Sequence, residues 1–215
     1  MDSAGVSTDE LLTRALRLID RGGRSILGIT GAPGAGKSTV AAMLVDRLGP
    51  RQVALVGMDA FHLDDEILRA HGSFDRKGAL DTFDGHGYAV MLERLAAARP
   101  GDDAIYAPRF DRASEASIGG AVEIPASVPL VVTEGNYLLI ESAPWPRARA
   151  TLREVWFLDL DDEIRRERLI ARHRSFGRSE TEARRRALGS DEANALLIKA
   201  TRSRADFVFR WEQLG

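Results

Sequence analysis

Four short runs of hydrophobic residues along the chain have the character of strands buried on both faces. They occupy residues 26–29, 53–56, 129–132 and 155–158. Such runs are continuous rather than alternating, which is typical of strands in the parallel sheets of α/β proteins. A shorter run at 207–209 predicts one more strand near the end of the sequence.

Amphipathic patterns between these runs predict helices. The first opens at Asp9 and stops at Gly22-Gly23, and the others are expected at residues 38–48, 88–98, 161–174, 181–188 and 191–203. The order strand, glycine-rich turn, helix, strand in the first quarter predicts a βαβ unit. We therefore expect an α/β fold in which helices flank a parallel sheet.

Two smaller features complete the expected organisation. The stretches 104–106 and 121–124 predict a small antiparallel excursion, and the arginine-rich segment 161–190 predicts a helical lid. The length of 215 residues fits one domain over 1–215. Most arginines of the lid segment alternate with acidic residues, a pattern that favours a solvated helix face with ion pairs between successive turns.

Composition excludes several classes of protein. Hydrophobic residues make up 44% and charged residues 29%, and 30 basic against 32 acidic side chains give a net charge of −2. This balance argues against a nucleic-acid binder, and no apolar stretch is long enough for a membrane span. The absence of cysteine excludes disulfides and a cysteine nucleophile, and the polar start of the sequence does not resemble a signal peptide. Together these features predict a cytoplasmic protein.

A glycine-rich segment between the first strand and its helix carries the strongest chemical signal. Residues 31–38 fit the pattern G-x-x-x-x-G-K-[ST], whose backbone N–H groups cradle phosphates. Lys37 is one of only three lysines, the other 27 cations being arginine, and its compact ammonium suits a tight phosphate loop. We expect ATP and Mg²⁺ as cofactors, and we expect the Ser38 hydroxyl to bind the metal ion. The predicted nucleotide-binding residues are Gly31, Gly34, Ala35, Gly36, Lys37, Ser38 and Thr39.

Candidates for the chemistry follow two other strands. Asp59 follows the strand at 53–56 and is a candidate general base, unless it only caps a helix. Glu134 follows the strand at 129–132 and is a candidate magnesium ligand, unless it is an ordinary residue at a strand end. None of the three lysines belongs to an N/T-K-x-D motif, so a guanine-nucleotide switch is excluded and phosphoryl transfer to a small molecule is favoured.

Five segments of the sequence together carry a resemblance to known proteins. They are residues 31–38, 58–62, 77–84, 106–112 and 133–139. In their order and spacing, over roughly residues 25–209, they resemble the superfamily of uridine kinase, phosphoribulokinase and bacterial pantothenate kinase. The Glu-Gly-Asn-Tyr-Leu-Leu version of the last segment looks most like the branch named nucleoside/nucleotide kinase-like or fructose transport system kinase.

The resemblance implies roles for individual residues. It implies that Asp59 is the general base, that Lys37 binds the phosphates and Ser38 the metal, and that Glu134 helps to position magnesium. It puts Asp84 in the acceptor pocket. It also implies that lid arginines close over the phosphates, to be chosen from Arg168, Arg172, Arg174 and Arg178, with Arg172 and Arg174 preferred.

The acceptor is the least determined part. The base-reading histidine of uridine kinases is missing after Phe110-Asp111-Arg112, so Arg109 and Arg112 are expected near a carboxylate, a phosphate or a sugar, unless they pair with nearby acids. His62 lies near the expected pocket, and Tyr137 either lines the cleft or covers the sheet edge. Lys77 is either a site residue or an exposed loop cation.

We expect a kinase that phosphorylates a hydroxyl of a small metabolite. A fructose-like sugar ranks first, and a nucleoside or pantothenate is the alternative within this class. A nucleotide-gated regulatory ATPase is the alternative from another class, and the resemblance also makes a homodimer a possibility.

Overall fold

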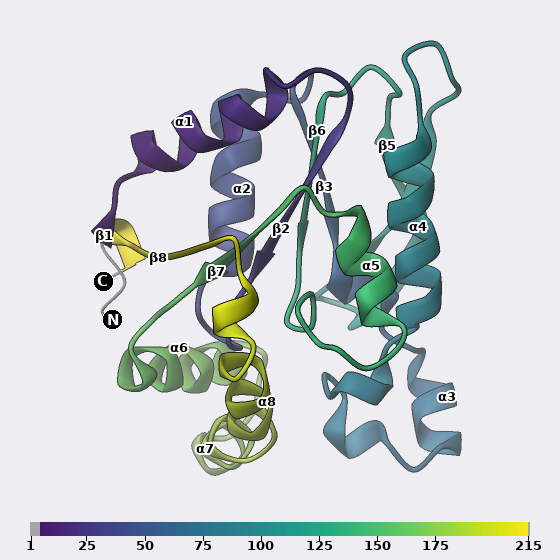
Figure 1. The fold of residues 1–215 in the computed structure, drawn as a ribbon. Coiled ribbons are helices and arrows are strands. Elements are labelled where there is room, and N and C mark those ends of the chain that lie inside the picture. The colour runs from purple at the N-terminus through teal and green to yellow at the C-terminus, as the bar shows by residue number, and fades with distance from the viewer. Residues whose placement is uncertain (1–4, 215) are drawn as a thin grey trace.

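A parallel sheet forms the centre of the molecule. The structure is a computed structural model that describes residues 5–214, and within them six strands pair in the order β1-β8-β7-β2-β6-β3 (Figure 1). All pairings in this sheet are parallel. The strands are β1 (Gly5–Val6), β2 (Ser25–Thr30), β3 (Val53–Gly57), β6 (Leu130–Glu134), β7 (Glu154–Leu158) and β8 (Phe207–Trp211).

The predicted fold class is confirmed. Each of the five hydrophobic runs corresponds to a strand of this sheet, although Pro129 precedes β6, and the strands extend one or two residues beyond most of the predicted ends. The expected antiparallel excursion is also present, as β4 (Ile105–Asp111) paired with β5 (Ala116–Ile124). The assignment of residues 1–215 to one domain stays a prediction, and residues 1–4 and 215 lie outside the described part.

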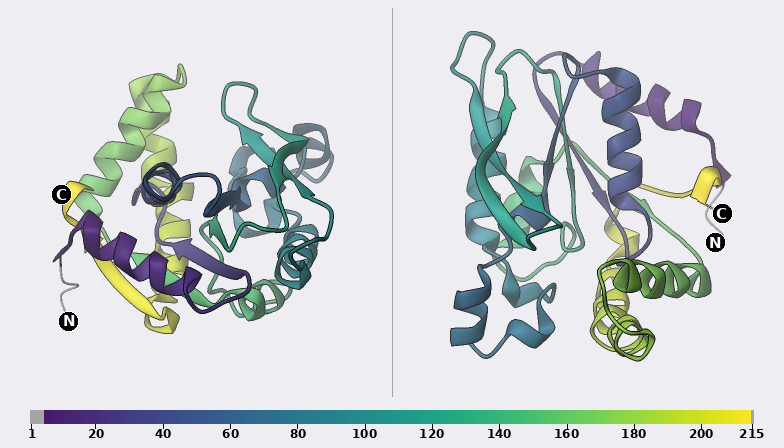
Figure 2. Two further views of the ribbon diagram at one scale, coloured as in Figure 1. Left: turned by 90° about the horizontal axis from the view of Figure 1, so that it is seen from above. Right: turned by 180° about the vertical axis from the view of Figure 1, so that it is seen from behind.

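Helices cover both faces of the sheet, as Figures 1 and 2 show. On one face, α1 (Thr8–Ile19) and α2 (Lys37–Leu48) pack on alternate strand residues such as Leu27. On the other face, α4 (Gly85–Ala97) and α5 (Trp145–Thr151) pack on the residues in between, such as Ile26. The continuous hydrophobic runs are therefore explained, because both sides of each central strand are buried.

Two helix boundaries differ from the sequence prediction by three or more residues. Helix α4 begins at Gly85 rather than residue 88, because the Asp84 carboxylate caps its first turn by accepting a hydrogen bond from the Gly87 N–H at 2.8 Å. The last predicted helix is shorter, since α8 (Ser190–Lys199) ends before a separate turn at Arg202–Arg204. The short helices α3 (Asp65–Ala70) and α5 were not predicted.

Three helices gather at the carboxyl edge of the sheet in the predicted lid region (Figure 1). They are α6 (Asp162–Ser175), α7 (Glu180–Leu188) and α8. Helix α6 rests on the glycine-rich loop so closely that a Cβ atom added to Gly34 would lie 2.8 Å from Leu169 Cγ and 2.9 Å from the Arg165 carbonyl oxygen. No helix in the described part of the chain combines the length and the apolar character that a membrane crossing requires.

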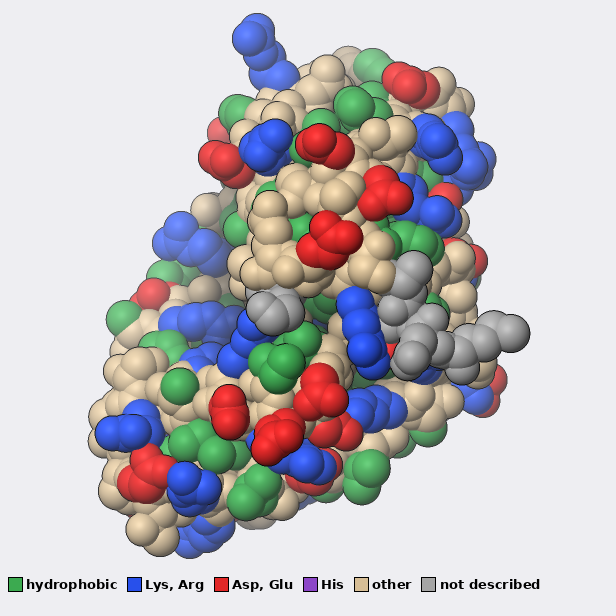
Figure 3. All heavy atoms as spheres, turned by 90° about the vertical axis from the view of Figure 1, so that its left-hand side faces the viewer, with side chains coloured by type: hydrophobic (Ala, Val, Ile, Leu, Met, Phe, Trp, Pro, Cys, Tyr) green, Lys and Arg blue, Asp and Glu red, His purple; other side chains and the backbone are tan. Residues whose placement is uncertain are grey.

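Arg165 fastens the lid helices to the loop. On the face shown in Figure 3, basic and acidic side chains are interspersed, as expected for solvated arginines. Arg165 differs from these residues because it is fully buried. Its guanidinium donates hydrogen bonds to Asp162 Oδ1 at 3.1 Å, to Glu192 Oε2 and to the Pro33 carbonyl oxygen at 3.4 Å. Hydrogen bonds from Arg166 and Arg165 lower the pKa of Glu192 to about 2, although partial burial opposes them.

Replacing this arginine is expected to destabilise the protein. Arg165→Ala leaves Asp162 and Glu192 with fewer partners and creates a cavity, so the free energy of unfolding at pH 7 should fall by about 3 kcal/mol. Arg184→Ala is the control, because Arg184 is exposed and its pair with Glu180 is worth less than about 1 kcal/mol. Urea unfolding measures both variants, and equal losses would contradict the anchoring role.

Candidate active site

The glycine-rich loop links β2 to α2 at the carboxyl edge of the sheet. Gly34 and Gly36 have φ angles of +83° and +101°, a region that favours glycine. Gly36 directly precedes the first helical residue, so the N–H groups of the loop and of the first turn of α2 lie together. This arrangement is suited to binding the phosphates of a nucleotide.

Lys37 is held inside this loop. Its Nζ donates hydrogen bonds to the Gly31 carbonyl oxygen at 2.9 Å and to the Ala32 carbonyl oxygen at 3.2 Å, and the residue is only 8% exposed. Burial lowers the pKa of the Lys37 ammonium to about 8, although the negative charges of Glu134 and Asp59 counteract part of this effect. A bound phosphate anion would stabilise the ammonium form, which burial disfavours.

Glu134 lies beside the loop because of the sheet register. It ends β6 and is paired with Ile29 of β2 on one side and Gly57 of β3 on the other. Ser38 Oγ donates a hydrogen bond to Glu134 Oε1 at 3.1 Å. Burial, and next the negative charge of Asp59, raise the pKa of the Glu134 carboxyl. A cation would therefore be favourable between these groups.

The donors present fit Mg²⁺ that arrives with nucleotide phosphates. Among the described residues, no group of three or more histidine, cysteine and acidic side chains has the arrangement of a metal cage. Mg²⁺ usually takes one or two protein oxygens and completes its octahedron with waters and phosphate oxygens. Ser38 and Glu134 supply oxygen donors of that kind next to the phosphate loop.

Asp59 lies in the helical turn Met58–Phe61, which directly follows β3. Its Oδ2 is 3.3 Å from Arg112 Nη2, so the predicted acceptor arginine pairs with the predicted base. His62 Nδ1 donates to the Asp59 carbonyl oxygen at 2.8 Å, and its ring lies 3.9 Å from that of Phe83. Burial lowers the pKa of the His62 imidazole. The carboxylate of Asp59 is not the cap of a helix, in contrast to that of Asp84.

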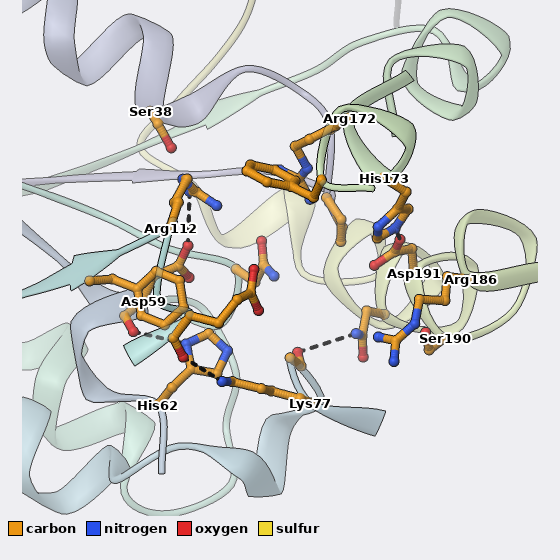
Figure 4. A pocket seen from close by; sticks show the side chains of 18 of the residues that line it. Ser38, Asp59, His62, Lys77, Arg112, Arg172, His173, Arg186, Ser190 and Asp191 are labelled. Atoms are coloured by element: carbon orange, nitrogen blue, oxygen red, sulfur yellow. Dashed lines mark hydrogen bonds and ion pairs between the residues drawn. The ribbon is translucent and has the colours of Figure 1, made fainter. Parts of the chain in front are cut away.

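These residues line a single cavity of about 280 Å³ (Figure 4). Its walls come from the phosphate loop, the segment between β3 and α4, the β4–β5 hairpin and the lid helices. Ser38 and Asp59 lie on the opposite side from Arg186 and Ser190 in Figure 4. The predicted residues among its lining are Lys37, Ser38, Asp59, His62, Arg112, Glu134 and Arg172, together with Gly34.

A second hollow adjoins the cavity at the start of α2. It is lined by Gly36, Thr39 and Arg168 in addition to residues that the two spaces share, among them Arg112 and Arg172. Arg172 is the one predicted lid arginine among the described residues that lines both spaces. Gly31, Ala35 and Gly36 belong to the loop that shapes these spaces.

Four predicted site residues outside the glycine-rich loop and α2 line neither space. Asp84 is occupied as the cap of α4. Arg174, which was preferred together with Arg172, is exposed and lies 3.2 Å from Glu180, so its contact with phosphates stays a prediction. Arg109 is exposed on β4. The Tyr137 hydroxyl donates to the Gly78 carbonyl oxygen at 2.6 Å, which places the ring behind the loop that forms the cavity wall.

Lys77 belongs to the cavity wall. The sequence alone did not decide between a site residue and an exposed loop cation. Its Nζ donates hydrogen bonds to Asp65 Oδ1 at 2.6 Å and to the Glu115 carbonyl oxygen at 2.7 Å, and its side chain is 11% exposed. Asn194 of α8 donates to the Gly78 carbonyl oxygen at 3.3 Å. Lys77 and Asn194 thus help to join the cavity's walls, and Lys77 heads one of the segments on which the resemblance rests.

Comparisons with known proteins relate the chain to kinases. No family model matches the chain. An ATP-dependent kinase-like protein of Aspergillus versicolor is 36% identical over 148 residues, which are 64% of this chain and 84% of that protein. A candidate uridine kinase of Schizosaccharomyces pombe is 29% identical and covers 98% of this chain and 93% of its own length.

A solved structure is similar over almost the whole chain. It is described as a candidate fructose transport system kinase from Silicibacter sp. and is 34% identical. The match covers 93% of this chain and 98% of that chain, with a TM-score of 0.77. Both sequence and fold therefore relate this chain to kinases.

The depressed pKa of Lys37 predicts proton uptake on nucleotide binding. Between pH 8 and the usual lysine pKa near 10, the empty site holds mostly neutral Lys37, and bound phosphates favour its ammonium form. Calorimetry with ADP at pH 9, in two buffers of different ionisation enthalpy, should therefore show uptake of a substantial fraction of a proton. This contribution disappears at pH 7, where Lys37 is already protonated. Absence of uptake at pH 9 would contradict the assignment.

Proposed function

The chain belongs to the P-loop kinase superfamily of uridine kinase, phosphoribulokinase and pantothenate kinase, and we propose that it transfers the γ-phosphate of ATP to a hydroxyl of a small sugar-like metabolite. The observation that carries this proposal is the convergence of Lys37, Asp59 and Glu134 on one cavity. Each follows or ends a different strand, and together they supply the charges that phosphoryl transfer needs.

Asp59 is the proposed general base. Its carboxylate accepts the proton of the acceptor hydroxyl while the hydroxyl oxygen forms a bond to the γ-phosphorus, and the bond from that phosphorus to the β–γ bridging oxygen breaks to release ADP. Arg112 pairs with this carboxylate in the structure at 3.3 Å. Arg112 is also proposed to contact the acceptor or the transferred phosphoryl group, since it lines both adjoining spaces.

The phosphate side of the cavity holds the nucleotide in this proposal. The loop N–H groups and Lys37 bind the β- and γ-phosphates, and Thr39 contributes at the start of α2. Ser38 and Glu134 hold Mg²⁺, which neutralises phosphate charge when bound. Arg172 closes from the lid over the same groups.

The acceptor side favours a polar metabolite. His62, Lys77 and Arg112 present hydrogen-bond donors there, and Phe83 and Phe110 add aromatic walls. A fructose-like sugar is our first choice, since the family branch resemblance and the missing base-reading histidine both favour it over a pyrimidine. A cytoplasmic location and a homodimer remain predictions.

Asp59→Asn is expected to abolish transfer while leaving nucleotide binding nearly intact. Asparagine keeps the shape of the side chain but does not accept the hydroxyl proton, so kcat should fall by at least about 10³-fold. Acceptor-dependent ADP release measures kcat, with the best acceptor found among sugars, nucleosides and pantothenate. Binding of ADP to the same preparation should change less than about threefold.

Asp64→Asn is the matched control for this variant. Asp64 lies five residues away and caps α3 by accepting the Glu66 N–H at 2.8 Å, outside the cavity lining. Asparagine caps helices about as well as aspartate, so activity should persist. Full activity of Asp59→Asn would overturn the base assignment.

A further inference from the structure

Two arginines of the lid segment face the cavity away from the phosphate loop. Arg178 and Arg186 line the main cavity, whereas neither lines the hollow beside the start of α2, where Arg168 and Arg172 lie. Figure 4 shows Arg186 next to Ser190 and Asp191, across the cavity from Asp59. The lid arginines thus form two groups, one beside the phosphate loop and one at the far wall of the cavity.

The two arginines of the far wall lack a carboxylate partner. No described acidic side chain lies within ion-pair distance of either guanidinium, although Asp191 and Asp75 influence Arg186 at longer range. Burial, and then the positive charge of Arg178, lower the pKa of Arg186. In contrast, Lys77 and Arg112 of the same cavity pair with acids.

Arg178 is held in place by a partly buried chain of hydrogen bonds. Arginine has only donors, so its Nη1 donates to His173 Nδ1 at 3.0 Å. His173 must then donate from Nε2 to Asp191 Oδ2, which lies 2.7 Å away. Asp191 is therefore occupied by His173, and the guanidinium of Arg178 keeps other N–H donors free for a ligand in the cavity.

We propose that Arg178 and Arg186 bind an anionic group of the acceptor, so that the metabolite carries a phosphate or a carboxylate in addition to the hydroxyl that is phosphorylated. This inference rests on the proposed function. Two neighbouring guanidiniums in a partly buried wall are stabilised by a bidentate oxyanion. The anion lies at the lid end of the cavity, and the hydroxyl lies at the opposite end near Asp59.

The position of this subsite would link recognition of the acceptor to closure of the lid over the cavity. Arg186 belongs to α7 and Arg178 to the segment between α6 and α7, while Asp59 and Lys77 belong to the opposite wall. An acceptor with an anion at one end bridges the two walls. A neutral sugar of the same size lacks the group that engages the lid, so it should bind more weakly.

Binding of matched ligands tests the proposal without requiring turnover. Calorimetry on the full chain, with Mg²⁺ and a non-hydrolysable ATP analogue present, compares sorbitol with sorbitol 6-phosphate and gluconate, and glycerol with glycerol 3-phosphate and glycerate. At least one charged ligand should bind about tenfold or more tightly than its neutral counterpart. The phosphate and carboxylate arms identify which anion the subsite prefers.

Arg186→Gln should lower the affinity for that charged ligand by about 10- to 100-fold and change the affinities for the neutral ligand and the ATP analogue less than about threefold. Arg184→Gln is the control, because Arg184 lies on the same helix, pairs with Glu180 at 2.7 Å and does not line the cavity. Arg178→Gln should act like Arg186→Gln.

Three results would overturn the proposal. They are equal binding of charged and neutral ligands by the wild type, a charge preference that survives in both arginine variants, and a loss of affinity that falls on the ATP analogue instead. Failure of the proposed function is separate from these results. It would appear as binding of the charged ligand without any transfer of phosphate.

Discussion

The register of the central strands is the constraint on which the site depends. Because β6 is paired in parallel with both β2 and β3, Glu134 lies level with Ile29 and Gly57. The next residues of those two strands lead into the phosphate loop and into Asp59. A slip of β6 by one residue would turn the Glu134 side chain to the other face of the sheet and remove it from Ser38. Packing of hydrophobic residues on both faces prevents that slip.

The same burial gives the site its electrostatic character. Burial lowers the pKa of the Lys37 ammonium and raises the pKa of the Glu134 carboxyl. The charged form of each side chain is therefore stabilised when an opposite charge enters the site. Nucleotide phosphates and a divalent cation bring such charges together. The lid is fixed to this centre at its root, since Arg165 reaches the loop carbonyl of Pro33. Motion of the lid is therefore expected in its outer helix rather than at that contact.

The sequence predicted those features that depend on local patterns. Lys37 and Ser38 were identifiable because a phosphate loop has a fixed spacing, and Asp59 because it follows a buried strand. Asp84, which the resemblance puts in the acceptor pocket, caps α4 and does not line the cavity, and its position three residues before Gly87 fits that cap. Arg165 could not be distinguished from the solvated arginines around it, because its partners at Pro33 and Glu192 lie 132 and 27 residues away.

The central claim is that the γ-phosphate ends on an organic hydroxyl. The most direct measurement is phosphorus NMR of a reaction that contains Mg·ATP and a mixture of sugars, sugar phosphates, sugar acids, nucleosides and pantothenate. Our account predicts one new phosphate ester that forms in a one-to-one ratio with ADP, with little inorganic phosphate. ADP that forms together with an equal amount of inorganic phosphate, at a rate independent of the mixture, would contradict it.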